Sequence, residues 1–246
     1  MELLLKYPVR VASYDVDPFG RLRLSAMMNY LQEVGRLHAR EIGVTVERLH
    51  EMGKTWVTTE LRIDVAHQPP VDTELTVLTW PSRRDEWEVI RDFEITASSG
   101  ELVAAASASY LFIDLATRRP TRLSELVPAE FCLDRKAIAD KRPPMSKLDR
   151  VDHEVRIPVM LRDLDVNWHV NNIVYAQWSL EAVPMEIWRE RRLESFEIAY
   201  RAEALQGDSV AVKLAIDQIE TGLQLRHEIS SSSRGIEVAR VRTRWT

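Results

Sequence analysis

The chain has 246 residues, 45% hydrophobic and 29% charged, so it can form one large domain or two small ones with ordinary globular composition. The net charge of -5 and pI of about 5.8 argue against nucleic-acid binding. The single cysteine, Cys132, excludes an intrachain disulfide and a cysteine-based zinc site. Residues 1–10 lack signal-peptide organisation, and no apolar run approaches the ~20 residues of a membrane span. We therefore expect a soluble, cytoplasmic protein with no membrane partner.

The first part of the chain predicts one helix followed by strands. A strand-like stretch runs through Val11, and apolar residues then recur every three or four positions along one helix face. Ser25 is a candidate N-cap of this helix, and Gly43 is a stop signal. Alternating or turn-flanked apolar runs predict strands over 61–65, 71–80, 86–97 and 102–113.

The composition then changes over residues 117–150, which hold four prolines among short apolar patches. This segment is typical of a connector rather than a domain. We expect one short helix within it, over residues 135–141, and a path across the surface of both halves.

Residues 151–246 repeat the pattern of the first part. Arg162–Asp165 echoes Tyr14–Asp17, after a strand-like stretch and before a helical run over 170–183. Pro184 marks a break before a second short helix, and strands are predicted over 196–200, 209–216, 223–230 and 236–245. Each half therefore reads β-α-β-β-β-β, an α+β arrangement with one helix against an antiparallel sheet.

The most informative stretch begins the second helical run: Asp165-Val166-Asn167-Trp168-His169-Val170-Asn171-Asn172. A carboxylate can orient or deprotonate, an imidazole can transfer protons near neutral pH, and an amide can hold a water or an oxyanion. The alternative is an Asx-rich turn that caps a helix. The spacing of these groups, together with a matching segment further along the chain, favours a site, with the two final asparagines as caps.

The pattern D-x-N-x-H-V-N-N resembles the signature of acyl-acyl-carrier-protein thioesterases, and the resemblance covers nearly the whole chain. It implies a double hotdog, two tandem copies of a long helix packed on a curved antiparallel sheet. The N-terminal hotdog, with the acyl pocket and a degenerate site, would span 1–116, the connector 117–150 and the catalytic hotdog 151–246. The implied activity releases free fatty acid from acyl carrier protein (ACP).

The resemblance also implies the catalytic residues. The family's Asp, Asn, His and strand Glu correspond to Asp165, Asn167, His169 and Glu203. Glu203 is the leading candidate for the base, with Asn167 and His169 positioning water and substrate and Asp165 orienting one of them. The two carboxylates could exchange roles. Without the resemblance, Glu203 would be interpreted as a solvated turn residue.

Two departures from this pattern bear on mechanism. Some family members carry Cys after the strand Glu, where this chain has Ala204, and Cys132 falls in the connector. A cysteine nucleophile is therefore disfavoured, while direct attack by a carboxylate stays open. In the first copy, Phe19 and Arg21 stand at the Asn167 and His169 positions, and neither can replace an amide or an imidazole.

Substrate contacts are implied in both copies. Met27, Met28 and Leu31 are candidates for lining the acyl pocket, although plain core packing explains them equally well. Trp168 shields the site, lines the pocket or simply packs.

No metal-ligand spacing or cofactor motif is present, so we expect neither a metal nor a cofactor. The arginine-bearing segments 82–84, 118–119 and 189–192 are solvated faces, or one of them docks the acidic carrier protein. A homodimer stays open. Two other functions compete with ACP thioesterase activity: an acyl-CoA thioesterase of the same fold and a non-catalytic acyl-binding hotdog protein.

Overall fold

The protein divides into two compact units, residues 1–140 and 141–246. The structure, a computed structural model, describes residues 3–122, 127, 129–138 and 143–246. The division between the units falls inside the segment whose composition indicates a connector. No helix in these described ranges is long and apolar enough to cross a membrane.

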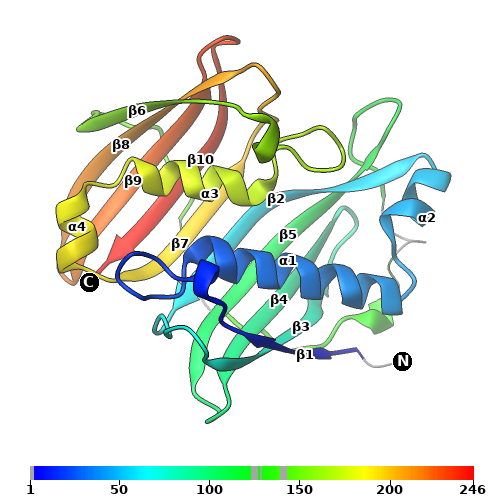
Figure 1. Ribbon diagram of the computed structural model, residues 1–246. Helices are drawn as coiled ribbons and strands as arrows, with labels where there is room; N and C mark the ends of the chain where they lie inside the picture. Colours follow the sequence, from blue (N-terminus) through cyan, green and yellow to red (C-terminus); the bar gives the residue numbers. More distant parts are fainter. Residues whose placement is uncertain (1–2, 123–126, 128, 139–142) are drawn as a thin grey trace. The chain divides into compact units, whose positions relative to one another are not determined.

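In the N-terminal unit, helix α1 packs on one face of an antiparallel sheet with strand order β1-β3-β4-β5-β2 (Figure 1). The core lies between this helix and the sheet, where Met27, Val77 and Phe93 are at most 1% exposed. The elements are β1 (Leu5–Arg10), η1 (Ser13–Asp15), α1 (Leu24–Glu41), α2 (Val46–Glu51), β2 (Lys54–Val65), β3 (Glu74–Arg84), β4 (Glu88–Ala97), β5 (Leu102–Asp114) and η2 (Ala129–Phe131).

The ends of α1 differ in how well local sequence predicts them. The N-cap is Arg23, without a side-chain cap, so the expectation of Ser25 was wrong by two residues. The apolar face begins at Leu24, which is 2% exposed, and its burial sets the start of the helix. At the other end Gly43 adopts a φ of 74° and donates from its N–H to the carbonyl of Arg40 at 3.1 Å. This left-handed glycine ends the helix as predicted.

The C-terminal unit repeats the arrangement, with α3 on an antiparallel sheet ordered β6-β8-β9-β10-β7 (Figure 1). The predicted β-α-β-β-β-β pattern of each half is confirmed, as is the short helix after Pro184, which is α4, while α2 was not predicted. The carbonyl of the Asn171 side chain accepts from the Ile173 N–H at 3.0 Å and caps α3, as expected. The elements are β6 (His153–Pro158), η3 (Leu161–Asp163), α3 (Asn172–Glu181), α4 (Met185–Glu190), β7 (Leu193–Tyr200), β8 (Ser209–Ile219), β9 (Gly222–Ser231) and β10 (Ile236–Trp245).

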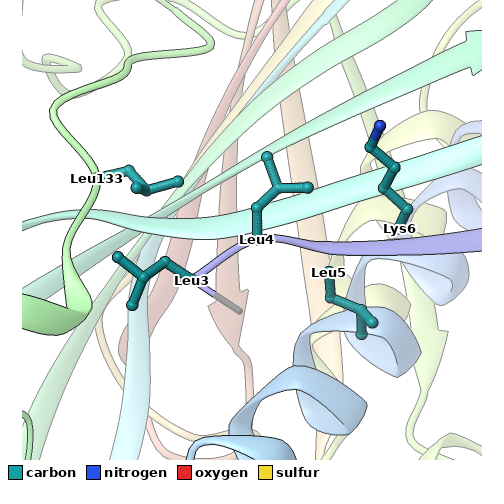
Figure 2. Close-up of a pocket in the computed structure, with 5 residues that line it drawn as sticks. All are labelled: Leu3, Leu4, Leu5, Lys6 and Leu133. Carbon is teal, nitrogen blue, oxygen red and sulfur yellow. The ribbon is translucent and has the colours of Figure 1, made fainter. Parts of the chain in front are cut away.

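The first part of the connector packs against the sheet of the N-terminal unit. The Trp80 indole donates to the carbonyl of Arg135 at 2.8 Å, and the Ala137 N–H donates to Asp92 Oδ2 at 2.9 Å. Because these main-chain groups bind the sheet, residues 135–138 are not helical, and the remainder of the expected helix lies outside the described residues. An open apolar groove of about 500 Å³ lies beside this segment (Figure 2). Its lining residues are Leu3, Leu4, Leu5, Lys6 and Leu133.

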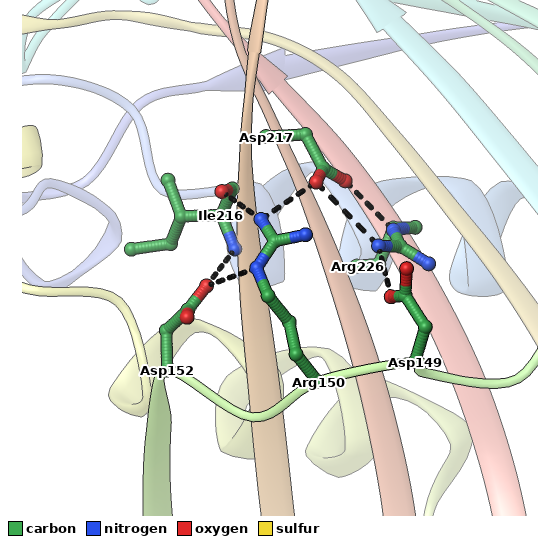
Figure 3. Close-up of polar contacts among 6 residues, drawn as sticks. All are labelled: Asp149, Arg150, Asp152, Ile216, Asp217 and Arg226. Atoms are coloured by element: carbon green, nitrogen blue, oxygen red, sulfur yellow. Dashed lines mark hydrogen bonds and ion pairs between the residues drawn. The ribbon is translucent and has the colours of Figure 1, made fainter.

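The last part of the connector is tied to the β8–β9 hairpin by alternating charges (Figure 3). Arg150 pairs with Asp152 at 3.2 Å and with Asp217 at 2.7 Å. Arg226 bridges the same Asp217 and Asp149, both at 2.7 Å. This network fixes the chain where it enters the C-terminal unit.

Candidate active site

A short loop before α3 presents the polar motif. The backbone N–H of Asp165 donates to the carbonyl of His169 at 2.8 Å and closes the loop. Asp165 Oδ1 then accepts from the backbone N–H of Asn167 at 2.8 Å and of His169 at 3.4 Å. The Asp165 side chain thus organises the loop through its backbone, and the Asn167 side chain is exposed.

Glu203 approaches this loop from the chain that follows β7. The Val170 N–H donates to the carbonyl of Ala204 at 3.4 Å, which holds the two segments together. His169 Nε2 lies 3.6 Å from Glu203 Oε2, and these side chains are 37% and 39% exposed. The structure therefore brings together the four residues implied by the family resemblance: three lie in one loop, and the fourth faces its imidazole.

Residues outside the sequence motif support the Glu203 backbone. Arg234 Nη2 donates to the Glu203 carbonyl, and the same guanidinium pairs with buried Asp208 at 2.7 Å. Arg234 lies between β9 and β10, and no local pattern in the sequence predicts that it reaches Glu203. Only the folded sheet brings the two together.

The first copy has the same loop with different chemistry. Asp17 Oδ1 accepts from the backbone N–H groups of Phe19 and Arg21 at 2.8 and 2.9 Å, as Asp165 does in the second copy. Arg21 pairs with Asp17 at 2.8 Å, and the two side chains are only 7% and 8% exposed. Gln68, which stands in the place of Glu203, donates to the carbonyl of Leu22 at 2.7 Å. The Arg21 and Gln68 side chains of this copy are therefore bonded to the loop, whereas His169 and Glu203, their counterparts in the second copy, are partly exposed to solvent.

The backbone of Trp168 adopts a conformation that is rare for residues other than glycine. Its φ is 60°, and the matching position in the first copy is Gly20 with a φ of 74°. A non-glycine residue in the left-handed region is uncommon, and such residues concentrate at functional sites. The indole is 68% exposed, so packing into a core does not account for it.

The residues expected to line an acyl pocket lie on α1 of the N-terminal unit. Met27, Met28 and Leu31 are 0%, 3% and 4% exposed. They face the sheet of their own unit, where core packing also places apolar side chains.

Cys132 follows η2 in the N-terminal unit and is partly buried. Burial raises the pKa of its thiol, which disfavours the nucleophilic thiolate. In the described ranges, no three His, Cys, Asp or Glu residues are grouped as metal ligands would be.

We expect Cys132→Ser to change the hydrolysis rate of a thioester substrate by no more than about threefold. The thiol is largely protonated at neutral pH, and its position is not part of the motif loop. Steady-state rates of the purified variant test this. A loss of more than about tenfold, roughly 1.4 kcal/mol of transition-state stabilisation, with an unchanged circular dichroism spectrum would reopen cysteine catalysis.

Two family models match the chain. Residues 3–131 match the acyl-ACP thioesterase N-terminal domain. Residues 146–246 match the acyl-ACP thioesterase C-terminal domain, which includes the loop and Glu203.

Curated relatives resemble the chain along most of its length. A dodecanoyl-ACP hydrolase of Cinnamomum camphora is 28% identical over 99% of this chain and 68% of that protein. An oleoyl-ACP thioesterase of Coriandrum sativum is 26% identical over 96% of this chain and 74% of that protein. The chain spans 60% and 64% of the lengths of two other relatives, from Cuphea viscosissima and Arabidopsis thaliana.

Solved structures share the fold. A 12:0-ACP thioesterase from Umbellularia californica superimposes with a TM-score of 0.88 at 25% identity, over 99% of this chain and 94% of that one. An acyl-ACP thioesterase from Bacteroides thetaiotaomicron gives a TM-score of 0.87 at 24% identity, over 99% and 98%. These likenesses confirm the predicted double-hotdog fold.

Proposed function

Because the chain belongs to the acyl-ACP thioesterase family, we propose that it hydrolyses the thioester joining a fatty acyl chain to ACP. Family membership confirms two predictions, the family itself and the enzyme class, which is thioester hydrolase. The observation that carries the proposal is the His169–Glu203 pair, in which Glu203 faces the loop that holds Asp165, Asn167 and His169. The products are a free fatty acid and the thiol of the carrier protein.

Glu203 and His169 can act on one water molecule. Their separation of 3.6 Å is longer than a hydrogen bond, and both side chains are accessible. A water between the substrate and these groups can donate to the Glu203 carboxylate while its oxygen approaches the thioester carbonyl. As the C–O bond forms, Glu203 takes the proton and His169 keeps the water in place.

The remaining steps need a donor for the oxyanion and a proton for the leaving group. The Asn167 amide supplies N–H donors for the carbonyl oxygen as negative charge develops there. When the tetrahedral intermediate collapses, the C–S bond breaks and its electron pair leaves with the sulfur. The proton held by Glu203 returns to the thiolate, directly or through His169, and the carboxylate is regenerated.

The geometry supports Glu203 rather than Asp165 as the base. Asp165 uses one carboxylate oxygen to accept two backbone hydrogen bonds within its loop. Asp17 makes the same two contacts in the first copy, which has neither the amide nor the imidazole. Because Asp17 makes these contacts in a copy that lacks the amide and the imidazole, their role is to organise the loop. Asp165 then orients Asn167 and His169 through their backbone.

Substrate contacts outside the reacting atoms form part of the same proposal. We place the acyl chain against Met27, Met28 and Leu31, whose apolar side chains lie on the buried face of α1. We place the Trp168 side chain beside the part of the substrate that extends from the site into solvent. The cytoplasmic location and a homodimer stay predictions, which cell fractionation and sedimentation would test.

Initial rates on acyl-ACP and acyl-CoA panels of matched chain lengths test the function. We expect release of free thiol and fatty acid in the presence of a chelator, with a higher kcat/KM on the ACP substrates. Higher kcat/KM throughout the CoA panel would assign the acyl-CoA thioesterase function instead. Binding of acyl-ACP without turnover on either panel would assign a non-catalytic acyl-binding protein.

A further inference from the structure

The backbone beside Glu203 is held by a buried tyrosine of helix α3. The N–H of Ala204 donates to the hydroxyl oxygen of Tyr175 at 2.8 Å. Tyr175 is 3% exposed and Ala204 is 0% exposed. The tyrosine ring packs edge-on against Tyr200 and tilted against Trp178, with centroid distances of 5.5 and 5.2 Å. Packing on these two rings fixes the position of the hydroxyl.

This hydrogen bond fixes the N–H of the Glu203–Ala204 peptide group, and a second hydrogen bond fixes its carbonyl. The carbonyl of that peptide belongs to Glu203 and accepts from Arg234. Because a peptide group is planar, fixing both its C=O and its N–H fixes its orientation. The Glu203 side chain leaves the backbone next to this plane, so its direction toward His169 depends on the two bonds.

The first copy lacks both partners of the hydrogen bond. Met27 stands where α3 has Tyr175, because the two loops match residue for residue into their helices. Pro69 stands where the second copy has Ala204, since the Leu22 N–H donates to the Pro69 carbonyl at 3.0 Å just as Val170 does to Ala204. Methionine offers only a weak acceptor and proline has no N–H. The N–H donor is therefore absent and the acceptor is weak, so the loop of the first copy forms without this hydrogen bond.

The Tyr175–Ala204 hydrogen bond is thus found in the copy that carries the candidate catalytic residues, and the loop of the other copy forms without it. The copy that has it directs a carboxylate at an imidazole, at 3.6 Å. The copy without it carries Gln68, whose amide is bonded to the backbone of its own loop. A bond needed to build the loop would be expected in both copies.

We propose that Tyr175 is a positioning residue that, through the Ala204 N–H, orients the Glu203–Ala204 peptide and directs the Glu203 carboxylate at His169. The inference rests on the proposed function, in which Glu203 is the base. Burial raises the pKa of Tyr175 to about 12, so its hydroxyl stays neutral and its own titration plays no part at working pH.

The test compares Tyr175→Phe with Tyr200→Phe. Tyr175→Phe should lower kcat on acyl-ACP by about tenfold or more, because a small misplacement of a reacting group has a large effect on rate. KM should change less than about twofold. Tyr200→Phe removes a hydrogen bond of similar length, 3.0 Å to the carbonyl of Asn172, within the same aromatic group. This control should leave kcat within about twofold of wild type.

A second variant separates positioning from stability. Tyr175→Phe leaves the Ala204 N–H buried without a partner and should lower Tm. The double variant Tyr175→Phe/Ala204→Pro removes that donor, as Pro69 does in the first copy, and should recover much of the lost Tm without recovering kcat. Wild-type kcat in Tyr175→Phe, or recovery of kcat together with Tm in the double variant, would overturn the inference.

NMR spectra of the His169 ring, recorded at one fixed pH, give a readout that does not depend on turnover. In Tyr175→Phe, the chemical shifts of the His169 ring should move toward those in Glu203→Gln, because the carboxylate that lies 3.6 Å from the imidazole in the wild-type protein no longer faces it. Unchanged chemical shifts contradict the positioning role even if the wild-type protein hydrolyses no substrate. Absence of wild-type turnover on both panels contradicts only the proposed function.

Discussion

Glu203→Gln, His169→Ala and Asn167→Ala are each expected to lower kcat on acyl-ACP by roughly two to four orders of magnitude, the range for a positioned proton-transfer or oxyanion group. Glu203→Gln keeps the shape of the side chain but removes the base. Neither member of the His169–Glu203 pair is deeply buried, with exposures of 37% and 39%, so each variant should stay folded. Steady-state kinetics measures the loss, after circular dichroism and Tm have established the fold.

The matched control lies in the first copy. Gln68→Ala removes the side chain that stands in the place of Glu203 and one hydrogen bond, to the carbonyl of Leu22. It should change kcat less than about threefold. Arg21→Ala is a poorer control, because it leaves Asp17 as a buried unpaired carboxylate and is expected to lower Tm. A Gln68→Ala loss as large as that of Glu203→Gln would show that the site is misplaced or shared between the copies.

Local signals in the sequence predicted most of the fold. Gly43 and Asn171 bond to groups two or three residues away, so the local sequence contains what determines these helix ends. Helix α2 was missed because its apolar periodicity is too short. This six-residue helix has one clear local signal, its N-cap Thr45, whose side chain accepts from the Arg48 N–H at 3.2 Å.

The residues of the candidate site also differ in whether the local sequence indicates them. Asp165, Asn167 and His169 share one loop, so their spacing alone indicated a functional cluster. Glu203 is 34 positions beyond His169 in the sequence, and only the family resemblance implied it. No local pattern in the sequence indicates a role for Tyr175, because its hydroxyl gains a partner only when the chain after β7 returns to the helix. Interactions of this kind depend on tertiary structure and have no local signature.

His227 is expected to make the folded protein sensitive to mild acid. It lies on β9, is 2% exposed, and neither of its ring nitrogens has a hydrogen-bond partner within the described part of the chain. Its cross-strand neighbours Leu214 and Val241 are 0% and 1% exposed. Burial in these surroundings lowers the pKa of His227 from 6.5 to about 3.

The sign of the effect follows from proton binding. Below pH 6.5 the unfolded chain protonates His227 while the folded protein keeps it neutral, so the unfolded state binds more protons and stability falls as the pH falls. The loss approaches about 1.4 kcal/mol per pH unit and reaches about 2 kcal/mol at pH 5. His227→Leu should remove this part of the pH dependence, and it should be more stable than wild type even at pH 7, because no unsatisfied polar ring remains buried.

Urea unfolding of wild type and His227→Leu at pH 7 and pH 5 measures the difference. The free energy of unfolding of the wild-type protein should fall by about 2 kcal/mol more than that of the variant between these pH values. His153→Gln is the matched control, because this histidine lies on β6 of the same unit and is exposed. It should reproduce the wild-type pH dependence. Equal losses in wild type and His227→Leu would mean that His227 takes up a proton inside the fold, and a polar partner or water would then have to reach its ring.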